Sequence, residues 1–410
     1  MGVLRLLLAL LVVYVHCRSP FGPLGVSAEN AVQIFFMISG FYMTLVLREK
    51  YALPGGLGVR AFYLNRGLRL LPAYFLVAAA TLFLCLFSKP LLGWEMPPAA
   101  ALRAWHEAGW LEWPALLWLG VTQLSMAGLE TFNFFSLPAT DAAAPGASAG
   151  PQPWELLLVP QAWSLSLELY FYLLAPVLVT RRPGIVLGLL LASFALRLVL
   201  WQFAGLYAGP WSYRFFPSEL MFFLLGALAY HAYAGWTDTG SPRPGQAAAW
   251  QRPWLRGLLA ALAAAAVLIS RSGQPFSPGH VIAPLVTALA FLALPVLFLK
   301  TRQLRADRLL GELSYPVYIV HFLIIWMVGQ GSYPASAGQF VLVAALTLLA
   351  ACGLYRYVDL PIDRWRHAAS RPAVPAAATP AAAEQHRDQW MNAQAGPRGL
   401  RLPRFSRAKP

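Results

Sequence analysis

Charged residues are scarce in this sequence: Asp, Glu, Lys and Arg make up 12% of 410 residues, about half the share found in ordinary soluble domains. Apolar residues make up 58%, more than one water-soluble core of this size could bury. Cysteine is scarce as well, and Cys17, Cys85 and Cys352 stand alone in or beside apolar stretches, so neither a disulfide framework nor a zinc or other metal site is expected. The composition therefore predicts a chain that lies mostly in a lipid bilayer.

The formal net charge of +14 would suit nucleic-acid binding only if a basic, folded soluble segment carried it. The sequence has no such segment. Lys and Arg instead form short clusters between apolar runs, which is typical of loops that face a cytoplasm and anionic lipid. We therefore expect no nucleic-acid partner, and we expect a multi-pass inner-membrane protein.

About ten apolar runs approach the roughly 20 residues needed to cross a bilayer. They are 3–19, 30–48, 70–88, 163–180, 184–203, 217–235, 254–270, 281–299, 312–330 and 338–356. If a further, interrupted run at 113–129 does not cross, most Lys and Arg fall in loops on the side of the N-terminus; if it crosses, this bias is largely lost. The positive-inside rule thus predicts an all-α polytopic protein of about ten transmembrane helices, with both termini cytoplasmic and 113–129 at the outer surface.

The chain divides into a transmembrane domain, 1–367, and a tail, 368–410, which is rich in Ala, Pro and Arg. The tail cannot bury a core, so we expect it to be disordered and cytoplasmic. Residues 3–16, with the Val-Ser-Ala that ends at Ala28, also resemble a cleavable signal peptide. An arginine and a histidine would be unusual in such a peptide, so we favour a retained first helix.

Arg5 and His16 are ionisable residues in the first predicted span, and such residues cost several kcal/mol unless they are paired or face a polar cavity. Steps of about 100° per residue return both to one helix face, about 16 Å apart along the axis. Arg5 then lies near the cytoplasm and His16 near the outer end, which suits an anionic donor inside and an acceptor outside. The alternative is a topological anchor at Arg5 and an interfacial histidine, and position alone does not decide between them.

Three carboxylates, Glu29, Glu168 and Glu219, fall at the outer level of their spans, where one beside His16 could orient the imidazole. On the cytoplasmic side, Arg66 and Arg69 share a helix face and could bind an anion, although topology alone could also explain them.

Further polar residues occur within the predicted spans at Arg197, Tyr315, Tyr318 and His321. The last three follow a three-residue step and form a polar stripe that should face the bundle. The alternative for this stripe is hydrogen bonding between helices.

Five blocks, in order along residues 3–363, give the strongest functional signal. They are LRLLLALLVVYVHC with Arg5 and His16; AVQIFFMISGFYMTLVL with Ser39; FYLNRGLRLLPAY with Arg66 and Arg69; AWSLSLELYFYLLAP with Trp163, Ser164 and Glu168; and LSYPVYIVHFLI followed by YRYVDLPI. Together they resemble the membrane-bound acyltransferase family 3, the bacterial sugar O-acyltransferases. The chain departs from the family pattern at Gln33, where many members have an acidic residue, and at Asp359, which replaces the usual Glu.

The resemblance implies an acyltransferase that uses an acyl-CoA, in the first instance acetyl-CoA, as co-substrate and a carbohydrate as acceptor. It implies that His16 is catalytic, with Glu168 or Glu29 beside it, and that Arg5, Arg66 and Arg69 bind the donor phosphates. The acceptor, the acyl chain and the choice between direct transfer and an acyl-enzyme stay open.

Two rival functions are a transporter or flippase for a lipid-linked saccharide, with Arg197 and His321 lining its path, and a subunit of an envelope complex.

Overall fold

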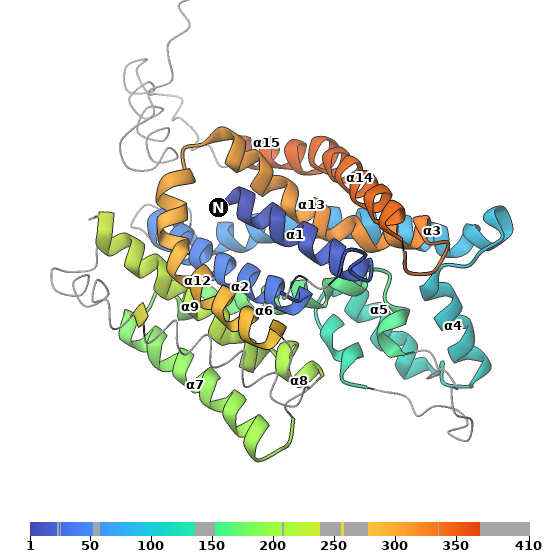
Figure 1. Ribbon diagram of the computed structural model, residues 1–410, viewed down its shortest axis with the longest axis horizontal. Coiled ribbons are helices and arrows are strands. Elements are labelled where there is room, and N and C mark those ends of the chain that lie inside the picture. Colours follow the sequence, from blue (N-terminus) through green and yellow to red (C-terminus); the bar gives the residue numbers. More distant parts are fainter. Residues whose placement is uncertain are drawn as a thin grey trace, which may run out of the picture.

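The part of the chain that the structure describes is built of helices alone (Figure 1). The structure is a computed structural model, and it describes residues 1–22, 24, 26–51, 58–135, 152–206, 209–237, 256–257, 278–334 and 336–369. The long helices are α1 (Gly2–His16), α2 (Ala28–Val46), α3 (Gly58–Leu92), α6 (Trp163–Leu178), α7 (Pro183–Gln202), α9 (Phe216–Thr237), α12 (Pro278–Thr301), α13 (Arg305–Val328) and α14 (Ala337–Leu354). The shorter elements are η1 (Leu47–Tyr51), α4 (Pro97–Glu107), α5 (Trp113–Ser125), η2 (Leu129–Asn133), η3 (Pro153–Leu156), η4 (Pro160–Ala162), α8 (Pro210–Tyr213), η5 (Tyr355–Asp359) and α15 (Leu360–Ala369).

Several helical stretches are long and apolar enough to cross a bilayer. They are Ala28–Tyr51, Gly58–Leu92, Pro183–Gln202, Arg305–Val328 and Ala337–Arg366, accompanied by the shorter apolar helices Gly2–His16 and Leu285–Thr301. The prediction of an all-helical membrane protein is thereby confirmed, whereas the count of ten spans and the cytoplasmic termini stay predictions. Each predicted span coincides with a long helix except 254–270, which lies almost wholly outside the described residues, as does the predicted tail after Ala369.

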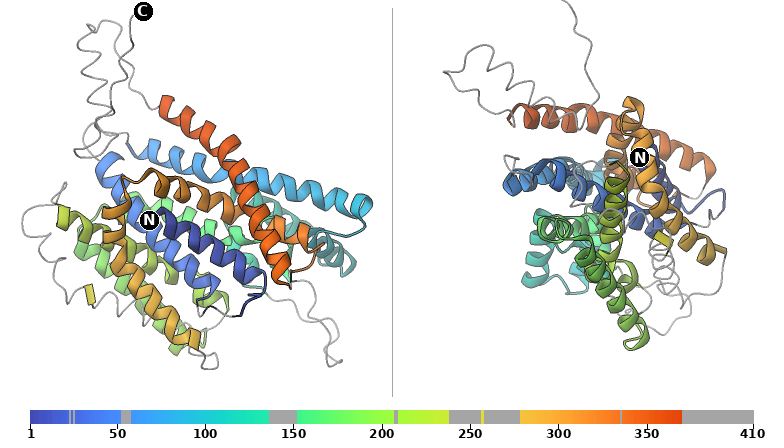
Figure 2. Two further views of the ribbon diagram at one scale, coloured as in Figure 1. Left: turned by 45° about the horizontal axis from the view of Figure 1, so that its top comes forward. Right: turned by 90° about the vertical axis from the view of Figure 1, so that its left-hand side faces the viewer.

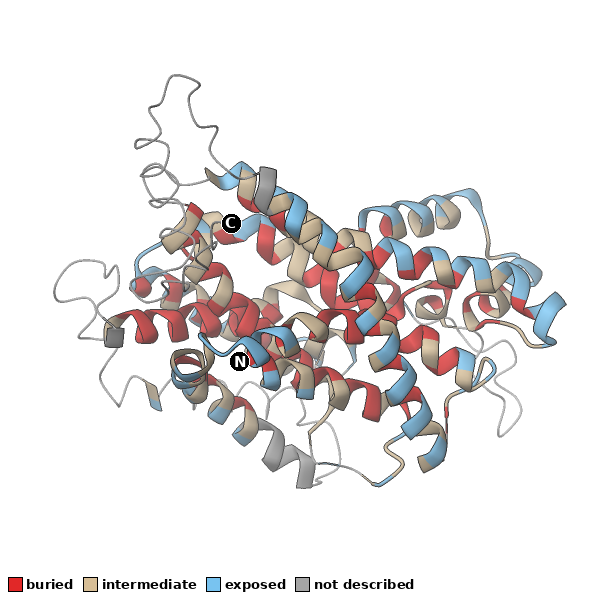
Figure 3. Cartoon of the chain, turned by 90° about the horizontal axis from the view of Figure 1, so that it is seen from above, coloured by how far each residue is buried: buried red, intermediate tan, exposed pale blue. Residues whose placement is uncertain are grey.

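Burial separates central helices from peripheral ones (Figure 3). In their most apolar stretches, 78% of the residues of α2 with η1 and 72% of those of α13 are buried inside the protein, against 22% for α7 and for α14 with its extension. Figure 2 shows α14 and α15 as an outer layer over α13. Because apolar side chains on the outer helices need an apolar solvent, these faces are the lipid contact.

Glycines let the central helices meet closely. A Cβ on Gly40 of α2 would lie 1.9 Å from the Phe223 carbonyl oxygen of α9, and a Cβ on Gly226 of α9 would lie 1.9 Å from the Met37 carbonyl oxygen of α2. The start of α1 meets α13 in the same way, because a Cβ on Gly2 would overlap the backbone of α13. Such contacts between small residues hold membrane helices together by close packing.

The N-terminus of α1 is fixed to α13 by the carboxylate of Asp307. This carboxylate accepts hydrogen bonds from the backbone N–H groups of Gly2, at 2.9 Å, and Val3, at 3.0 Å, which α1 itself cannot satisfy. The negative charge also complements the positive end of the helix dipole. Asp307 and the glycine contact thus set the depth and rotation of α1, and with them the positions of Arg5 and His16.

Helix α3 begins at Gly58, well before the predicted span at 70–88. Arg66 and Arg69, which precede the predicted span, are therefore part of the same helix as that span. Arg, Leu and Ala favour helix here, so α3 extends over 35 residues. Its length of about 50 Å exceeds the thickness of the hydrocarbon core of a bilayer. At the other end of the bundle, α4 and α5 lie near the end of α1 (Figure 1); the outer position of 113–129 stays a prediction.

Candidate active site

His16, the last residue of α1, lies against His321 of α13. Its Nδ1 is 3.3 Å from His321 Nε2, and the two rings stack with their centroids 5.2 Å apart. His321 is fully buried, and its Nδ1 lies 2.6 Å from the backbone carbonyl oxygen of Tyr318, one helical turn earlier. Phe322 covers both imidazoles. The first and fifth sequence blocks therefore meet at a pair of histidines.

The fourth block joins this site through the hydroxyl of Tyr318. Ser164 Oγ lies 2.7 Å from Tyr318 Oη, which also donates to the Gln161 carbonyl oxygen at 3.1 Å. The Gln161 amide donates in turn to the Ile319 carbonyl oxygen at 2.6 Å. The start of α6 is thus locked to the middle of α13, next to the histidine pair.

Two charged side chains, Glu29 at the start of α2 and Arg214 after α8, act electrostatically on His16. The Arg214 guanidinium carbon lies 4.8 Å from the ring centroid of Trp163 and 4.9 Å from that of Tyr213, within range for cation–π attraction. Burial lowers the pKa of Arg214, while Tyr213 and Glu29 oppose that shift. Arg214 thus places a guanidinium group, stacked on the ring of Trp163, in electrostatic range of His16.

Glu168 lies in a second group, with Ser39 and Tyr172. Its Oε1 accepts hydrogen bonds from Ser39 Oγ at 2.7 Å and from Tyr172 Oη at 2.6 Å. The carboxylate acts electrostatically on Arg5, at the other end of α1 from His16. Of the two carboxylates expected beside His16, the structure therefore brings only Glu29 into electrostatic range of it and places Glu168 with the residues on the Arg5 side.

The Arg5 end of α1, which is the inner end in the predicted orientation, carries a cluster of basic and acidic groups. Arg69 Nη1 of α3 pairs with Glu312 Oε2 of α13 at 2.7 Å, and both side chains act on Arg5. The resemblance implied that Arg5, Arg66 and Arg69 bind the donor together, and the tertiary structure brings Arg69 into electrostatic range of Arg5. Asp359, the departure from the family pattern, acts electrostatically on the buried Tyr315 hydroxyl beside this cluster.

Arg66 differs from Arg69 in having an unsatisfied group. Its Nε is buried and has no hydrogen-bond partner within the described part of the chain. The guanidinium carbon lies 6.0 Å from the ring centroid of Tyr172, the same tyrosine that donates to Glu168. A buried donor without an acceptor costs free energy, and an anionic ligand would supply the missing acceptor.

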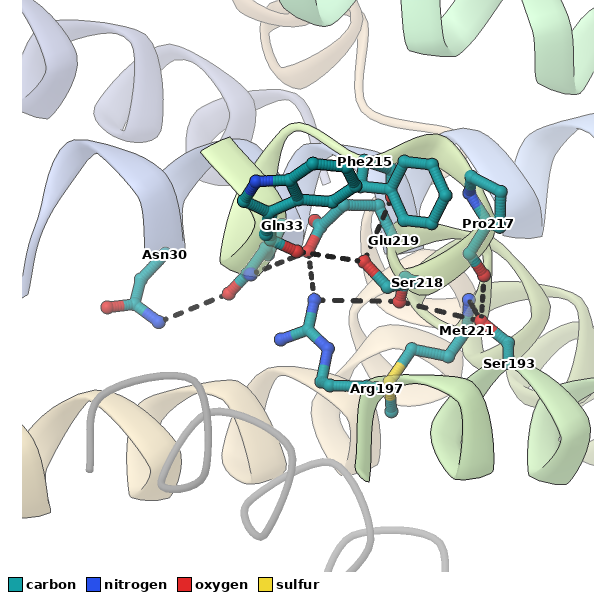
Figure 4. A network of polar contacts seen from close by, with 10 residues as sticks. Asn30, Gln33, Ser193, Arg197, Phe215, Pro217, Ser218, Glu219 and Met221 are labelled. Atoms are coloured by element: carbon teal, nitrogen blue, oxygen red, sulfur yellow. Dashed lines mark hydrogen bonds and ion pairs between the residues drawn. The ribbon is translucent and has the colours of Figure 1, made fainter. Parts of the chain in front are cut away.

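Arg197 and Gln33 belong to a separate network, shown in Figure 4. The Arg197 guanidinium forms an ion pair with Glu219, and Gln33 Nε2 donates to the same carboxylate oxygen at 3.2 Å. Asn30 donates to Gln33 Oε1 at 3.4 Å. All four side chains are buried and tie α2, α7 and α9 together, so the amide at residue 33 acts as a donor to a carboxylate supplied by another helix.

Tyr315 ties α13 to α3, since its hydroxyl donates to the Leu70 carbonyl oxygen at 2.6 Å. This bond, like those of the Tyr318 hydroxyl with Ser164 and the Gln161 carbonyl, is the hydrogen bonding between helices that was the alternative for the polar stripe, whereas His321 contacts His16. Sequence reasoning did not single out Glu312, Gln161 or Arg214. Glu312 opens a predicted span, and its position as an ionisable residue there could have drawn attention to it.

Curated proteins with similar sequences include the O-acetyltransferase OatA of Staphylococcus aureus, from strain NCTC 8325 / PS 47 and from strain COL. Each is 23% identical over 348 residues, which is 81% of this chain and 52% of the relative. The chain thus spans about half the length of these relatives. No solved structure matches it.

The family comparison covers much more of the chain. A family model described as an acyltransferase domain matches residues 1–356, a range that contains the histidine pair, the inner arginine cluster and all but the end of the fifth block. The chain therefore belongs to the membrane-bound acyltransferase family 3.

Proposed function

We propose that this protein transfers an acyl group, in the first instance acetyl, from an acyl-CoA to a hydroxyl of a cell-envelope or exported carbohydrate. The observation that carries the proposal is the arrangement along α1, with an arginine cluster at one end and an imidazole at the other. The name of the Staphylococcus aureus relatives, O-acetyltransferase, supports the acetyl group and the oxygen acceptor. The proposed location is the bacterial inner membrane.

The donor would bind at the inner cluster. Arg66 has a buried Nε without a hydrogen-bond partner among the described residues, and Arg5 and Arg69 provide two further guanidinium groups, of which that of Arg69 is paired with Glu312. Guanidinium groups suit the phosphates of a nucleotide-linked donor because they donate bidentate hydrogen bonds and keep their charge.

The acceptor would react at His16. An imidazole nitrogen takes the proton of the acceptor hydroxyl, and the oxygen then attacks the thioester carbonyl carbon. A new C–O bond forms, the C–S bond breaks, and the departing thiolate receives the proton from the imidazolium. Atoms and charge balance without a metal or a redox partner. Glu29 acts on His16 electrostatically and favours the transient cation.

The test is acyl transfer from labelled acyl-CoA to the carbohydrate fraction of membranes that contain the protein. His16→Ala should lower the rate by about 10²- to 10⁴-fold, the usual contribution of a general base. His106→Ala is the control, because His106 is an exposed histidine of α4. A well-expressed His16→Ala protein with full activity would remove His16 from the mechanism.

The same assay separates this function from that of a flippase for a lipid-linked saccharide. A flippase consumes no acyl-CoA, and its flux would not respond to the labelled donor. A transport path was expected to be lined by Arg197 and His321. Both make contacts within the protein instead, because Arg197 pairs with Glu219 and His321 contacts His16 and the Tyr318 carbonyl.

A further inference from the structure

His321 is a buried imidazole that the transfer chemistry described above does not use. It lies in the middle of α13, is fully buried, and has a close polar neighbour at each ring nitrogen. One neighbour is a carbonyl oxygen, which only accepts hydrogen bonds, and the other is the ring of His16. This arrangement determines where the protons of both rings lie.

The bonding pattern can be followed from the carbonyl outward. At 2.6 Å from the Tyr318 carbonyl oxygen, His321 Nδ1 must carry a hydrogen and donate it. In the neutral ring, Nε2 then has no hydrogen and accepts. His16 Nδ1, 3.3 Å away, must therefore be the donor of the second hydrogen bond. In this tautomer the lone pair of His16 is on Nε2. The Val12 carbonyl, one turn earlier in α1, also forms a hydrogen bond with the His16 ring and, like the Tyr318 carbonyl, can only accept it.

We propose that His321 is a positioning residue that holds His16 in the tautomer with Nδ1 protonated, so that Nε2 is the nitrogen that accepts the proton of the acceptor hydroxyl. This inference rests on the proposed function for its chemical meaning. The base in such a site must have its lone pair on the nitrogen that faces the substrate, and a third group commonly enforces this.

The surroundings of His321 favour a neutral ring. Its stacking partners are His16, Phe322 and Tyr318, and no described carboxylate forms an ion pair with it. A buried imidazolium without a counter-ion would carry a large desolvation cost. When His16 takes up a proton, its bond to the neutral His321 becomes charge-assisted and stronger, so the same contact stabilises the cation formed during transfer.

The Tyr318 carbonyl is itself held in place. It accepts a second hydrogen bond from Gln161 Nε2 at 3.4 Å, while the Tyr318 hydroxyl is fixed by Ser164 and the Gln161 carbonyl. The start of α6 therefore supports the carbonyl that sets the His321 tautomer. This support explains why Trp-Ser of the fourth block and Tyr-x-x-His of the fifth block lie together although they are far apart in sequence.

The direct test is nitrogen NMR of the purified, full-length protein labelled with ¹⁵N-histidine, because protonated and unprotonated ring nitrogens have different shifts. We expect His16, assigned by the loss of its signals in His16→Gln, to show a protonated Nδ1 and an unprotonated Nε2 at neutral pH. A His16 ring that is protonated at Nε2, or an equal mixture of tautomers, would overturn the inference. This measurement needs no acyl donor and no change at His321.

Two variants then test the consequence for catalysis. In His321→Gln, the side-chain carbonyl can still accept from His16 Nδ1, so we expect it to keep most of the activity. In His321→Leu the side chain of residue 321 no longer accepts a hydrogen bond from His16, and kcat should fall by about 10- to 100-fold with the KM for acyl-CoA unchanged. His231→Leu is the control for loss of a buried imidazole, because His231 lies in α9 away from the site.

The variants also separate failure of the inference from failure of the proposed function. Should acyl transfer depend on His16 while His321→Leu matches wild type, the positioning role alone is wrong. Should His321→Leu and His321→Gln lose activity equally, the ring serves packing rather than the tautomer, and the inference is again wrong. If no acyl-CoA is consumed at all, the proposed function fails, and the NMR result still decides the tautomer.

Discussion

At the scale of single residues, the polar groups inside this membrane protein fall into those with partners and those without. Arg69 has Glu312, and Glu168 has Ser39 and Tyr172, so these groups are satisfied within the protein. Arg66 Nε and Glu130 Oε2 are buried without a hydrogen-bond partner among the described residues. Because leaving such atoms unpaired costs stability, they are the positions where ligand binding and pH should have measurable effects.

Arg66→Gln should weaken donor binding. We expect the KM for acyl-CoA to rise by about 10- to 100-fold, since a hydrogen bond to a charged group contributes about 1.5–3 kcal/mol. Arg60→Gln is the matched control, because Arg60 lies on the same helix and is exposed. Equal KM values for the two variants would place the donor phosphates elsewhere.

Glu130→Gln should change how stability depends on pH. Burial raises the pKa of the Glu130 carboxyl above its ordinary value of 4.5, although Tyr170 donates a hydrogen bond to it. The folded protein thus holds this proton more tightly than the unfolded chain does. Its stabilising contribution is fully present below about pH 4.5 and is lost as the pH rises through the raised folded pKa, by at most about 1.4 kcal/mol per pH unit.

The measurement is thermal unfolding in detergent across pH 4 to 8 for wild type and Glu130→Gln. The slope that Glu130 contributes should be absent from the variant, whose amide has no charge to desolvate. Parallel pH profiles for the two proteins would show that Glu130 does not titrate differently in the folded state.

At the scale of helices, the position of the site depends on two close crossings, α1 on α13 and α2 on α9. Gly226→Ala tests the second crossing, because a Cβ there would lie 1.9 Å from the Met37 carbonyl oxygen. Overpacking of this kind costs about 1–3 kcal/mol, so we expect a lower unfolding temperature. In Gly188→Ala of α7, no heavy atom lies within 4 Å of the added Cβ, and stability should be unchanged or slightly higher. A Gly226→Ala protein as stable as Gly188→Ala would mean that the crossing is looser than described.

At the scale of the whole molecule, the proposed chemistry requires the two ends of α1 to face opposite sides of the membrane. Cysteine labelling tests this requirement in a variant without Cys352, the exposed native cysteine. A membrane-impermeant maleimide added to intact cells should label His106→Cys in α4 and should not label Arg308→Cys in the first turn of α13, although both positions are exposed. The reverse pattern would invert the predicted orientation.

The sequence predicted some site contacts and missed others for reasons that the structure makes clear. Arg5 and His16 share a face because that relation depends only on the helical period within α1. Glu168 was expected beside His16 from its early position in a span. Residues 153–162, which include η3 and η4, already lie within the helix bundle, and Leu157 and Gln161 are buried. The first residues of α6 therefore lie inside the bundle and not at its outer edge, where the start of the predicted span would place them.

The partner of Arg69 could not be predicted either, because Glu312 is 243 residues away and reaches Arg69 only when α3 packs on α13. The same holds for the partner of His321. The three-residue step singled out His321 itself, but its contact with His16 depends on the packing of α1 against α13.

By itself, the sequence determined that the chain is helical and lies in a membrane, where its long helices are, and which residues resemble an acyltransferase, because hydropathy, helical period and short motifs are local properties. Only the tertiary structure decided which helices lie at the centre and which polar groups meet. Those contacts depend on the depth and rotation of each helix, and these are set by steric packing at Gly2, Gly40 and Gly226 and by the Asp307 cap.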